Sequence, residues 1–371
     1  MPALEEVLAG RDPALVVVPS DGDNAAELRA LRVGEAIDDD VALVVTTSGT
    51  TGAPKGALLT AAALMASASA THARLGGPGS WLLALPPYHI AGLQVLVRSV
   101  LAGSAPVELN VSDGFDVAQL PGAVRSLGSG RRYTSLVAPQ LAKALTDPAA
   151  AVALGELDAV LLGGGPAPRP VLDAAIAAGI PVVRTYGMSE TAGGCVYDGV
   201  PLDGVALRLA DGGRIIIGGA TLAKGYRNPV VPDPFAEPGW FRTDDVGTVD
   251  EAGVLAVLGR ADDAISTGGL TVLPQPVEAA LCTHPAVSDC AVFGLADDRL
   301  GQRVVAAIVV KDGCEPPTLE ALRAEVARTL NATAAPRELH IVDALPRRGI
   351  GKIDRAALAR RFGDPNARSD Q

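Results

Sequence analysis

The alternation of short apolar runs with alanine-rich stretches constrains the fold of this chain more than any other feature. Apolar runs such as Val41–Val45, Trp81–Leu85 and Val182–Thr185 are bounded by Gly, Pro or Ser, which is typical of buried strands. Ala61–Ala73 and Pro170–Ala178 have helical length, and the second begins with proline and is followed by glycine, as helices often are. This pattern predicts an α/β fold in which helices cover both faces of a mixed or parallel sheet.

The pattern changes in the second half of the chain. Residues 205–260 contain short apolar runs joined by Asp-Gly and Gly-Gly pairs, which predict a β-rich layer. Residues 263–371 then predict a smaller α+β unit. Because 371 residues exceed the usual domain size of about 100–150, more than one domain is expected. We predict a large domain over 1–259, a connection over 260–262 and a small domain over 263–371.

Composition and charge argue against several classes of protein. Lys and Arg number 31 and Asp and Glu 42, and no basic stripe is present, so nucleic-acid binding is not expected. The longest apolar run is interrupted by Arg98 and the N-terminus is acidic, so neither membrane insertion nor a signal peptide is predicted. The cysteines form no short paired spacing; they are Cys195, Cys282, Cys290 and Cys314. Neither a metal knuckle nor a disulfide framework is therefore predicted, and a cytoplasmic location is expected.

The strongest local motif is TTSGTTGAPKG at residues 46–56, between a predicted strand and a predicted helix. Its glycines allow close backbone approach to a ligand, and its hydroxyls, amides and lysine can bind phosphate oxygens. The motif is not a Walker A loop, because Pro54 stands where the second glycine should be. A mobile surface loop is the alternative interpretation. The candidates for ATP binding are Thr47, Ser48, Gly49, Thr50, Thr51, Gly52 and Lys55.

With this loop, the chain resembles the adenylate-forming superfamily, which includes acyl- and aryl-CoA ligases, luciferases and peptide-synthetase adenylation domains. The remaining motifs follow in the family's order and cover nearly the whole chain: PPYHIAG (86–92), GGGP (163–166), YGMSET (186–191), WFRTDD (240–245), GRADD (259–263) and GKIDR (351–355). The resemblance implies the family's fold, shortened at the N-terminus, with a mobile C-terminal domain. It also implies ATP, Mg²⁺ and coenzyme A as co-substrates.

The resemblance implies three catalytic candidates, namely Lys352, His89 and Glu190. Lys352 would reach the α-phosphate and the acyl oxygens, Glu190 would help to bind Mg²⁺, and His89 belongs to the motif of the acid pocket. In-line attack of a carboxylate on a phosphate joins two anions, so positioned cations must neutralise the growing charge.

The resemblance also implies binding residues and a hinge. Asp245 would hold the ribose hydroxyls with Arg260 nearby. The remaining assignments are Gly163, Gly164, Gly165, Tyr186 and Gly187 for the nucleotide, His89, Gly187 and Met188 for the acid, Gly268 and Gly269 for coenzyme A, and Asp262 for the hinge. Because Lys352 and the two coenzyme A glycines cannot face one active site together, the C-terminal domain is predicted to swing.

Two positions depart from the family's pattern. Asp244 replaces the usual glycine and leaves two neighbouring carboxylates, of which the alignment favours Asp245 as the ribose ligand. Ser266 stands where many members carry lysine. The role of that lysine is therefore absent here or is served by another residue.

Within the superfamily, segments such as WLLALPPYHIAGLQVLVRS and VVRTYGMSETAGGCVYDGVPLDGV are most similar to o-succinylbenzoate–CoA ligases of menaquinone biosynthesis, especially the short actinobacterial type. Another acid, or a carrier protein in place of free coenzyme A, is the alternative; a homodimer is also considered. The substrate's second carboxylate could contact His89 or the amides of 187–194. Arg98 is a weaker candidate for this contact, because a structural ion pair is its favoured interpretation.

Overall fold

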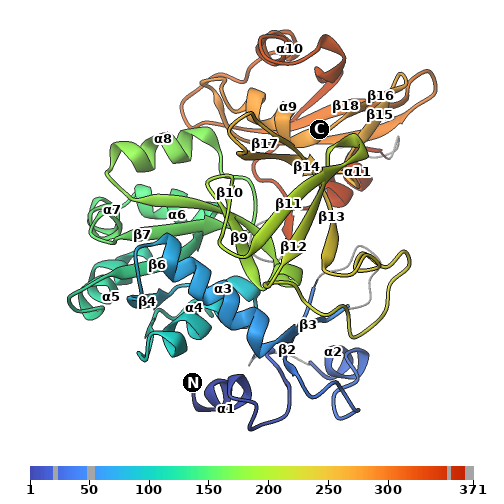
Figure 1. Ribbon diagram of the computed structural model, residues 1–371. Coiled ribbons are helices and arrows are strands. Elements are labelled where there is room, and N and C mark those ends of the chain that lie inside the picture. Colours follow the sequence, from blue (N-terminus) through green and yellow to red (C-terminus); the bar gives the residue numbers. More distant parts are fainter. Residues whose placement is uncertain (20–23, 48–54, 349–351, 364–371) are drawn as a thin grey trace.

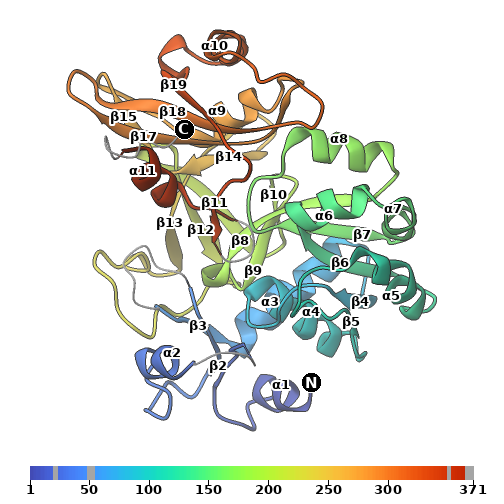
Figure 2. The same ribbon diagram turned by 180° about the vertical axis from the view of Figure 1, so that it is seen from behind.

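The computed structural model describes residues 1–19, 24–47, 55–348 and 352–363. The chain up to about residue 260 forms the larger body, and the following residues form a smaller unit that packs on one end of it (Figures 1 and 2). The larger body contains three sheets, and the smaller unit is built around a fourth. The predicted α/β class is confirmed.

The N-terminal part forms a three-stranded sheet of order β1-β2-β3. All five residues of β2 are buried, and β2 pairs in parallel with β1 and antiparallel with β3. The side chain of Thr60 accepts a hydrogen bond from the amide of Ala63 and so caps the following helix. The elements are β1 (Leu15–Val16), β2 (Val41–Val45), β3 (Ala57–Thr60), α1 (Pro2–Leu8), α2 (Ala25–Ala30) and α3 (Ala61–Arg74).

The central sheet has seven strands in the order β10-β9-β8-β7-β6-β4-β5. Strands β5, β4, β6, β7 and β8 pair in parallel. Strand β9 pairs antiparallel with β8, and β10 pairs antiparallel with β9, so the sheet is mixed as predicted. The strands are β4 (Ser80–Leu83), β5 (Val107–Glu108), β6 (Arg132–Val137), β7 (Ala159–Gly163), β8 (Val182–Met188), β9 (Gly193–Tyr197) and β10 (Val200–Pro201).

Helices cover both faces of the central sheet. Since successive strand residues point to opposite faces, neighbouring residues of one strand pack against different helices. Trp81 and Leu83 of β4 belong to a core with residues of α3 and α4, whereas Leu82 belongs to a core with residues of α5 to α8. The helices are α4 (Ile90–Leu101), α5 (Leu120–Ser126), α6 (Ala138–Leu145), α7 (Pro148–Gly155) and α8 (Arg169–Ala177). None of the helices in the described part has the length and apolar sequence that spanning a membrane requires.

The predicted β-rich layer is an antiparallel sheet of order β11-β12-β13-β14. Its last two strands place Asp245 opposite Arg260, next to a bulge between Val246 and Gly247. The strands are β11 (Val205–Ala210), β12 (Arg214–Gly219), β13 (Trp240–Val249) and β14 (Leu255–Arg260).

The smaller unit has its own hydrophobic core on each face of its sheet. One cluster packs α9 and α10 against residues such as Val292 and Val304, and the other packs α11 against Phe293 and Val305. Every residue of both clusters lies after position 264. The elements are β15 (Ile265–Thr267), β16 (Leu270–Val272), α9 (Pro274–Leu281), β17 (Val287–Asp297), β18 (Gly301–Val310), α10 (Leu319–Ala327), β19 (Glu338–Ile341), β20 (Arg347–Arg348), β21 (Lys352–Ile353) and α11 (Arg355–Gly363).

Candidate active site

A short hydrogen bond joins the central sheet to the antiparallel layer at the centre of the site. The hydroxyl of Tyr186 on β8 donates to Oδ2 of Asp245 on β13 over 2.7 Å. Burial and the charge of Asp245 raise the pKa of Tyr186 well above its ordinary value, so the phenol stays protonated and remains a donor.

Asp245 is held in a polarised environment. Its amide donates to Oγ1 of Thr243 over 3.0 Å. Burial raises the pKa of Asp245, and the Tyr186 hydrogen bond and the charges of Arg260 and Lys352 offset part of that rise. Within the described residues, the carboxylate accepts one hydroxyl hydrogen bond at Oδ2, and Oδ1 has no hydrogen-bond partner.

The neighbouring Asp244 has different surroundings, because successive residues of a strand point to opposite faces. Asp244 is exposed and forms ion pairs with Arg214 over 3.1 Å and with Arg260 over 3.3 Å. Arg260 also contacts the predicted hinge residue Asp262 over 3.0 Å. Of the two adjacent carboxylates, Asp245 is the one that lies beside Tyr186.

Glycines at the ends of β7 and β8 allow the backbones in the site to approach closely. A Cβ on Gly187 would lie 2.1 Å from the carbonyl oxygen of Gly193, and a Cβ on Gly163 would lie 2.5 Å from Oγ1 of Thr185. Gly164 has a φ of +82°, a left-handed conformation that favours glycine. Gly165 has open space around it, so nothing in its surroundings requires glycine.

Glu190 lies just after β8, in a single 3₁₀ turn over Ser189–Thr191. Its carboxylate is buried, and Oε1 accepts a hydrogen bond from the hydroxyl of Tyr226 over 2.6 Å. Within the described part of the chain, Oε2 has no hydrogen-bond partner. Mg²⁺ is usually bound through one or two carboxylates together with substrate phosphates and water. Glu190 therefore fits a metal ion that is also bound by a nucleotide.

Met188 precedes this turn, and its amide donates to the hydroxyl of Thr191 over 3.0 Å. Its side chain packs against a buried cluster that includes Cys195 and Ile217. The structure thus brings Tyr186, Met188 and Glu190 together on one short segment.

Most of the predicted phosphate loop, namely Ser48, Gly49, Thr50, Thr51 and Gly52, lies outside the described residues. Thr47 follows β2, and its Oγ1 is buried without a hydrogen-bond partner among the residues that the structure describes. On the other side, Nζ of Lys55 lies 5.4 Å from the ring centroid of Tyr226. Lys55 therefore lies near the tyrosine whose hydroxyl binds Glu190.

Lys352 reaches the site from the smaller unit. It lies exposed on β21, which pairs with β20 in a two-stranded hairpin. Its positive charge adds to the lowering of the pKa of His89 and offsets part of the rise in the pKa of Asp245. Burial is the larger cause for His89, which is therefore neutral at neutral pH. The His89 ring lies 4.6 Å from that of Tyr88, at the start of α4.

A buried ion pair places the Lys352 hairpin. Nη2 of Arg355 contacts both carboxylate oxygens of Glu278, over 2.6 and 2.8 Å, and Nε of Arg355 donates to the carbonyl of Val292 over 3.0 Å. Glu278 is buried on α9 and also accepts from the amide of Val292. Sequence analysis did not single out Arg355, Glu278 or Tyr226, although Arg355 belongs to the same motif as Lys352.

The structure does not bring every predicted residue to the site. Gly268 and Gly269 form the turn of the β15–β16 hairpin, with φ values of +58° and +79° that are typical of a type I′ turn. This hairpin lies at the outer edge of the C-terminal sheet, away from β8 (Figures 1 and 2). Ser266, on the same hairpin, is exposed and donates its amide to Gln302.

Arg98 is buried on α4 without the ion pair that was expected. Its guanidinium lies 4.9 Å from the ring of Trp81, and Nη2 approaches the hydroxyl of Tyr197 at 3.4 Å. No carboxylate pairs with it within the described residues, and its Nε has no hydrogen-bond partner there. Burial lowers the pKa of Arg98. The interpretation of Arg98 as a structural ion-pair partner is therefore not supported.

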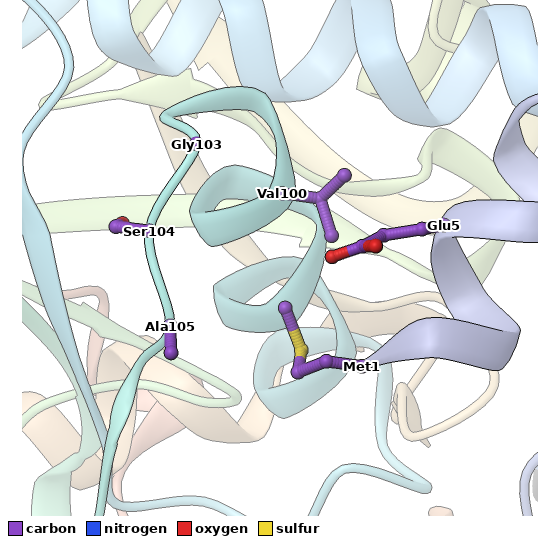
Figure 3. A pocket seen from close by; sticks show the side chains of 6 residues that line it. All are labelled: Met1, Glu5, Val100, Gly103, Ser104 and Ala105. Carbon is purple, nitrogen blue, oxygen red and sulfur yellow. The ribbon is translucent and has the colours of Figure 1, made fainter.

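Two surface hollows lie away from these residues. One, of about 290 Å³, separates α1 from the end of α4, where Met1 and Glu5 reach toward Val100 (Figure 3). The other, of about 370 Å³, lies between α1, β2 and the start of α3. Neither is lined by a predicted site residue.

Comparisons with known proteins match both parts of the chain. Residues 6–227 match the model of the AMP-binding enzyme family, and residues 276–352 match its C-terminal domain. The probable 2-succinylbenzoate–CoA ligase of Mycobacterium tuberculosis (strain H37Rv) is 80% identical over 364 residues, covering 98% of this chain and 94% of that protein. The 2-succinylbenzoate–CoA ligase of Geobacillus sp. (strain WCH70) is 36% identical, covering 86% and 69%.

Solved structures give the same result. The o-succinylbenzoate coenzyme A synthetase of Bacillus subtilis in complex with its acyl-adenylate intermediate superimposes with a TM-score of 0.75 at 30% identity, covering 87% of this chain and 72% of that one. The same enzyme in complex with ATP and a magnesium ion gives a TM-score of 0.74 at 29% identity, covering 88% and 73%.

The Tyr186–Asp245 bond leads to a prediction about ionisation. Tyr186→Phe removes a hydrogen bond that lowers the pKa of Asp245, so the pKa of Asp245 should rise above its value in the unmodified protein. Carbon-13 NMR of aspartate-labelled protein would measure this during a pH titration. Asp244 is the internal control, since Tyr186 does not touch it. An unchanged or lower pKa of Asp245 would contradict the prediction.

Proposed function

We propose that this chain, which belongs to the AMP-binding enzyme family, is the ATP-dependent 2-succinylbenzoate–CoA ligase of menaquinone biosynthesis; 2- and o-succinylbenzoate are the same acid. The observation that carries this proposal is the 80% identity to the mycobacterial ligase over nearly the full length of both proteins. The match to a structure that holds the corresponding acyl-adenylate supports the same reaction.

The reaction has two halves. The succinyl carboxylate attacks the α-phosphorus of ATP, which forms the acyl-adenylate and releases pyrophosphate. The thiol of coenzyme A then attacks the acyl carbon, loses its proton and displaces AMP, leaving a thioester. In the first half two anions approach each other, so electrostatic stabilisation by fixed donors and cations is the main task of the protein.

The nucleotide is oriented by the junction of β8 and β13. Asp245 accepts bonds from the ribose hydroxyls, and Tyr186 holds its carboxylate in place through the 2.7 Å bond. Arg260 lies opposite Asp245 in the β13–β14 ladder and adds positive charge. Gly163, Gly164 and Gly187 keep the adenine side of the pocket free of side chains.

Glu190 would hold Mg²⁺ through Oε2, which has no hydrogen-bond partner among the described residues, and the ion would supply positive charge to the ATP phosphates. The phosphates themselves lie along the loop between Thr47 and Lys55. Lys352 supplies a mobile cation for the α-phosphate and the acyl oxygens, opposite the neutral ring of His89. His89, Gly187 and Met188 line the acid site beside it.

The second carboxylate of the substrate needs a counter-charge. Arg98 is a buried guanidinium without an acidic partner in the described structure, and a buried cation that remains unpaired is costly. We therefore favour Arg98 over His89 and the amides of 187–194 as the group that attracts this carboxylate.

A panel of acids tests the proposal and its alternatives. AMP release should depend on coenzyme A, and 2-succinylbenzoate should give the highest kcat/KM among aryl and fatty acids. A different preferred acid would contradict the assigned substrate. An enzyme that loads a carrier protein would form the adenylate without consuming free coenzyme A.

The C-terminal unit, residues 263–371, moves relative to residues 1–259 through a hinge at 260–262. Its two hydrophobic clusters contain only its own residues, which suits a unit that rotates as one body. In the proposed reaction the unit rotates after adenylation, so that Gly268 and Gly269 replace Lys352 at the site and guide coenzyme A. Asp262, which is exposed and lies two residues after the end of β14, absorbs the change in backbone angles.

We also assign the enzyme to the cytoplasm. The four cysteines form no short paired spacing that would indicate a disulfide framework, which fits a reducing compartment. A homodimer stays a prediction, which multi-angle light scattering would check.

Lys352→Ala should affect only the first half-reaction. Loss of one donor aimed at the developing charge typically lowers the rate about 10²–10³-fold, so pyrophosphate release should fall by this factor. Thioester formation from supplied o-succinylbenzoyl-adenylate should persist, because Lys352 has by then moved away. The two half-reactions are assayed separately. Unchanged pyrophosphate release would refute the catalytic role and leave Lys352 an ordinary surface lysine.

Asp245→Ala should raise the KM for ATP well over tenfold. Each charge-assisted hydrogen bond contributes about 1.5–3 kcal/mol, and this interaction is present in the ground state as well as the transition state. Asp244→Gly is the matched control and should have a mild effect, since it restores the residue that the family usually carries. Initial-rate kinetics at varied ATP would measure both. The reverse pattern would show that the register is wrong by one residue.

Asp262→Pro should impair the second half-reaction more than the first, whereas Lys352→Ala should impair the first. Proline fixes φ and removes an amide that has no hydrogen-bond partner in the described backbone, so one of the two orientations should be trapped. Thioester formation from preformed adenylate should fall far more than adenylation. Equal loss of both would reject the hinge assignment.

A further inference from the structure

We propose that Tyr226 is a positioning residue that fixes the Glu190 carboxylate for the metal ion on the ATP phosphates. This inference rests on the proposed function, because it concerns the metal that accompanies ATP. Tyr226 lies in the connection between β12 and β13, 36 residues after Glu190, and does not belong to any of the sequence motifs described above.

The geometry of the contact leaves one carboxylate oxygen free. The Tyr226 hydroxyl donates to Oε1 over 2.6 Å, while Oε2 has no partner in the described part of the chain. A tyrosine hydroxyl is protonated at neutral pH, so the phenol donates this hydrogen bond and the carboxylate accepts it. A carboxylate held at one oxygen presents the other in a fixed direction, which is how outer partners orient metal ligands.

The backbone around Tyr226 forms hydrogen bonds with two other parts of the site, residues 55–58 and the turn that carries Glu190. Residues 224–228 run beside residues 55–58: the amide of Lys224 donates to Leu58, that of Leu58 to Gly225, that of Arg227 to Gly56 and that of Asn228 to Lys55, over 2.7–3.0 Å. The amide of Ala223 donates to the carbonyl of Glu190 over 2.9 Å. One segment therefore binds both the end of the phosphate loop and the turn that carries Glu190.

The ring of Tyr226 is also held in place. It meets Phe235 edge to face at 5.5 Å, and Nζ of Lys55 lies 5.4 Å from its centroid. The next residue, Arg227, is buried and donates to four backbone carbonyls of residues 31–36, which fixes the segment from its other side. The phenol thus has little freedom, and its hydroxyl points at the carboxylate.

Metal affinity separates a positioning role from a structural one. Loss of an outer partner of a metal ligand typically lowers metal affinity or activity about 10–100-fold. We would measure the binding of Mn²⁺, by the electron paramagnetic resonance of the free ion, to enzyme with α,β-methylene-ATP, whose α–β bond cannot be cleaved in adenylation. Tyr226→Phe should weaken Mn²⁺ binding by about this factor and should leave the affinity for the nucleotide without metal within threefold.

Two further variants complete the design. Tyr133→Phe removes a buried hydroxyl that donates to the carbonyls of Leu75 and Gly77, far from Glu190. It should lower the melting temperature but leave Mn²⁺ affinity unchanged. Glu190→Gln should weaken Mn²⁺ binding, and adding Tyr226→Phe to it should cause little further loss, because residues that act together are not additive.

The outcomes distinguish this inference from the proposed function. The titration uses neither the acid nor coenzyme A, so it does not depend on which substrate the enzyme activates. Equal Mn²⁺ affinity of Tyr226→Phe and the unmodified protein would overturn the positioning role alone, as would full additivity with Glu190→Gln. Failure of the unmodified protein to bind the metal–nucleotide complex would overturn the proposed function and this inference together.

Discussion

The close approach of β8 and β9 at Gly187 is the constraint on which the rest of the site depends. The turn between the two strands is buried, and Ala192 and Gly193 in it adopt positive φ values of 50° and 97°. Its backbone is satisfied from outside, because Oγ of Ser67 on α3 and Nε2 of Gln94 on α4 both donate to the carbonyl of Ala192, over 2.9 and 2.7 Å. Two helices of one face of the sheet thereby fix the segment that carries Tyr186 and Glu190.

The two parts of the protein contribute side chains of opposite charge to the site. The larger body contributes acceptors, Asp245 and Glu190, each held by a tyrosine hydroxyl whose pKa burial raises. The smaller unit contributes the cation Lys352. Because a phenol donates without adding charge, the tyrosines orient these carboxylates without neutralising them. The net charge of −11 is no obstacle to ATP, since the charges that matter are local.

Sequence patterns predicted the local elements better than the contacts between them. The apolar run Val41–Val45 correctly predicted β2. The family's motifs alone identified Tyr186, Asp245 and Lys352 as candidate site residues. Tyr226 and Glu278 were missed because their importance comes from partners that are distant in sequence, Glu190 and Arg355. Arg98 shows the opposite error: an arginine on an apolar helix suggested an ion pair, but the acidic partner is not found among the described residues. Long-range pairing of polar side chains has no periodicity that a single sequence can reveal.

The way in which Lys352 is anchored bears on its proposed role in the first half-reaction. Its hairpin is tied to the smaller unit through Arg355, whose partners Glu278 and Val292 both lie in that unit. Toward the larger body, Lys352 makes no hydrogen bond within the described structure, and it acts on His89 and Asp245 only through its charge. Its departure therefore breaks no specific bond, whereas Asp245 and Glu190 stay fixed by hydrogen bonds inside the larger body. Once pyrophosphate has left, the attraction that holds the lysine near the phosphates weakens. In the proposed mechanism, release of the first product would then favour the predicted rotation of the smaller unit.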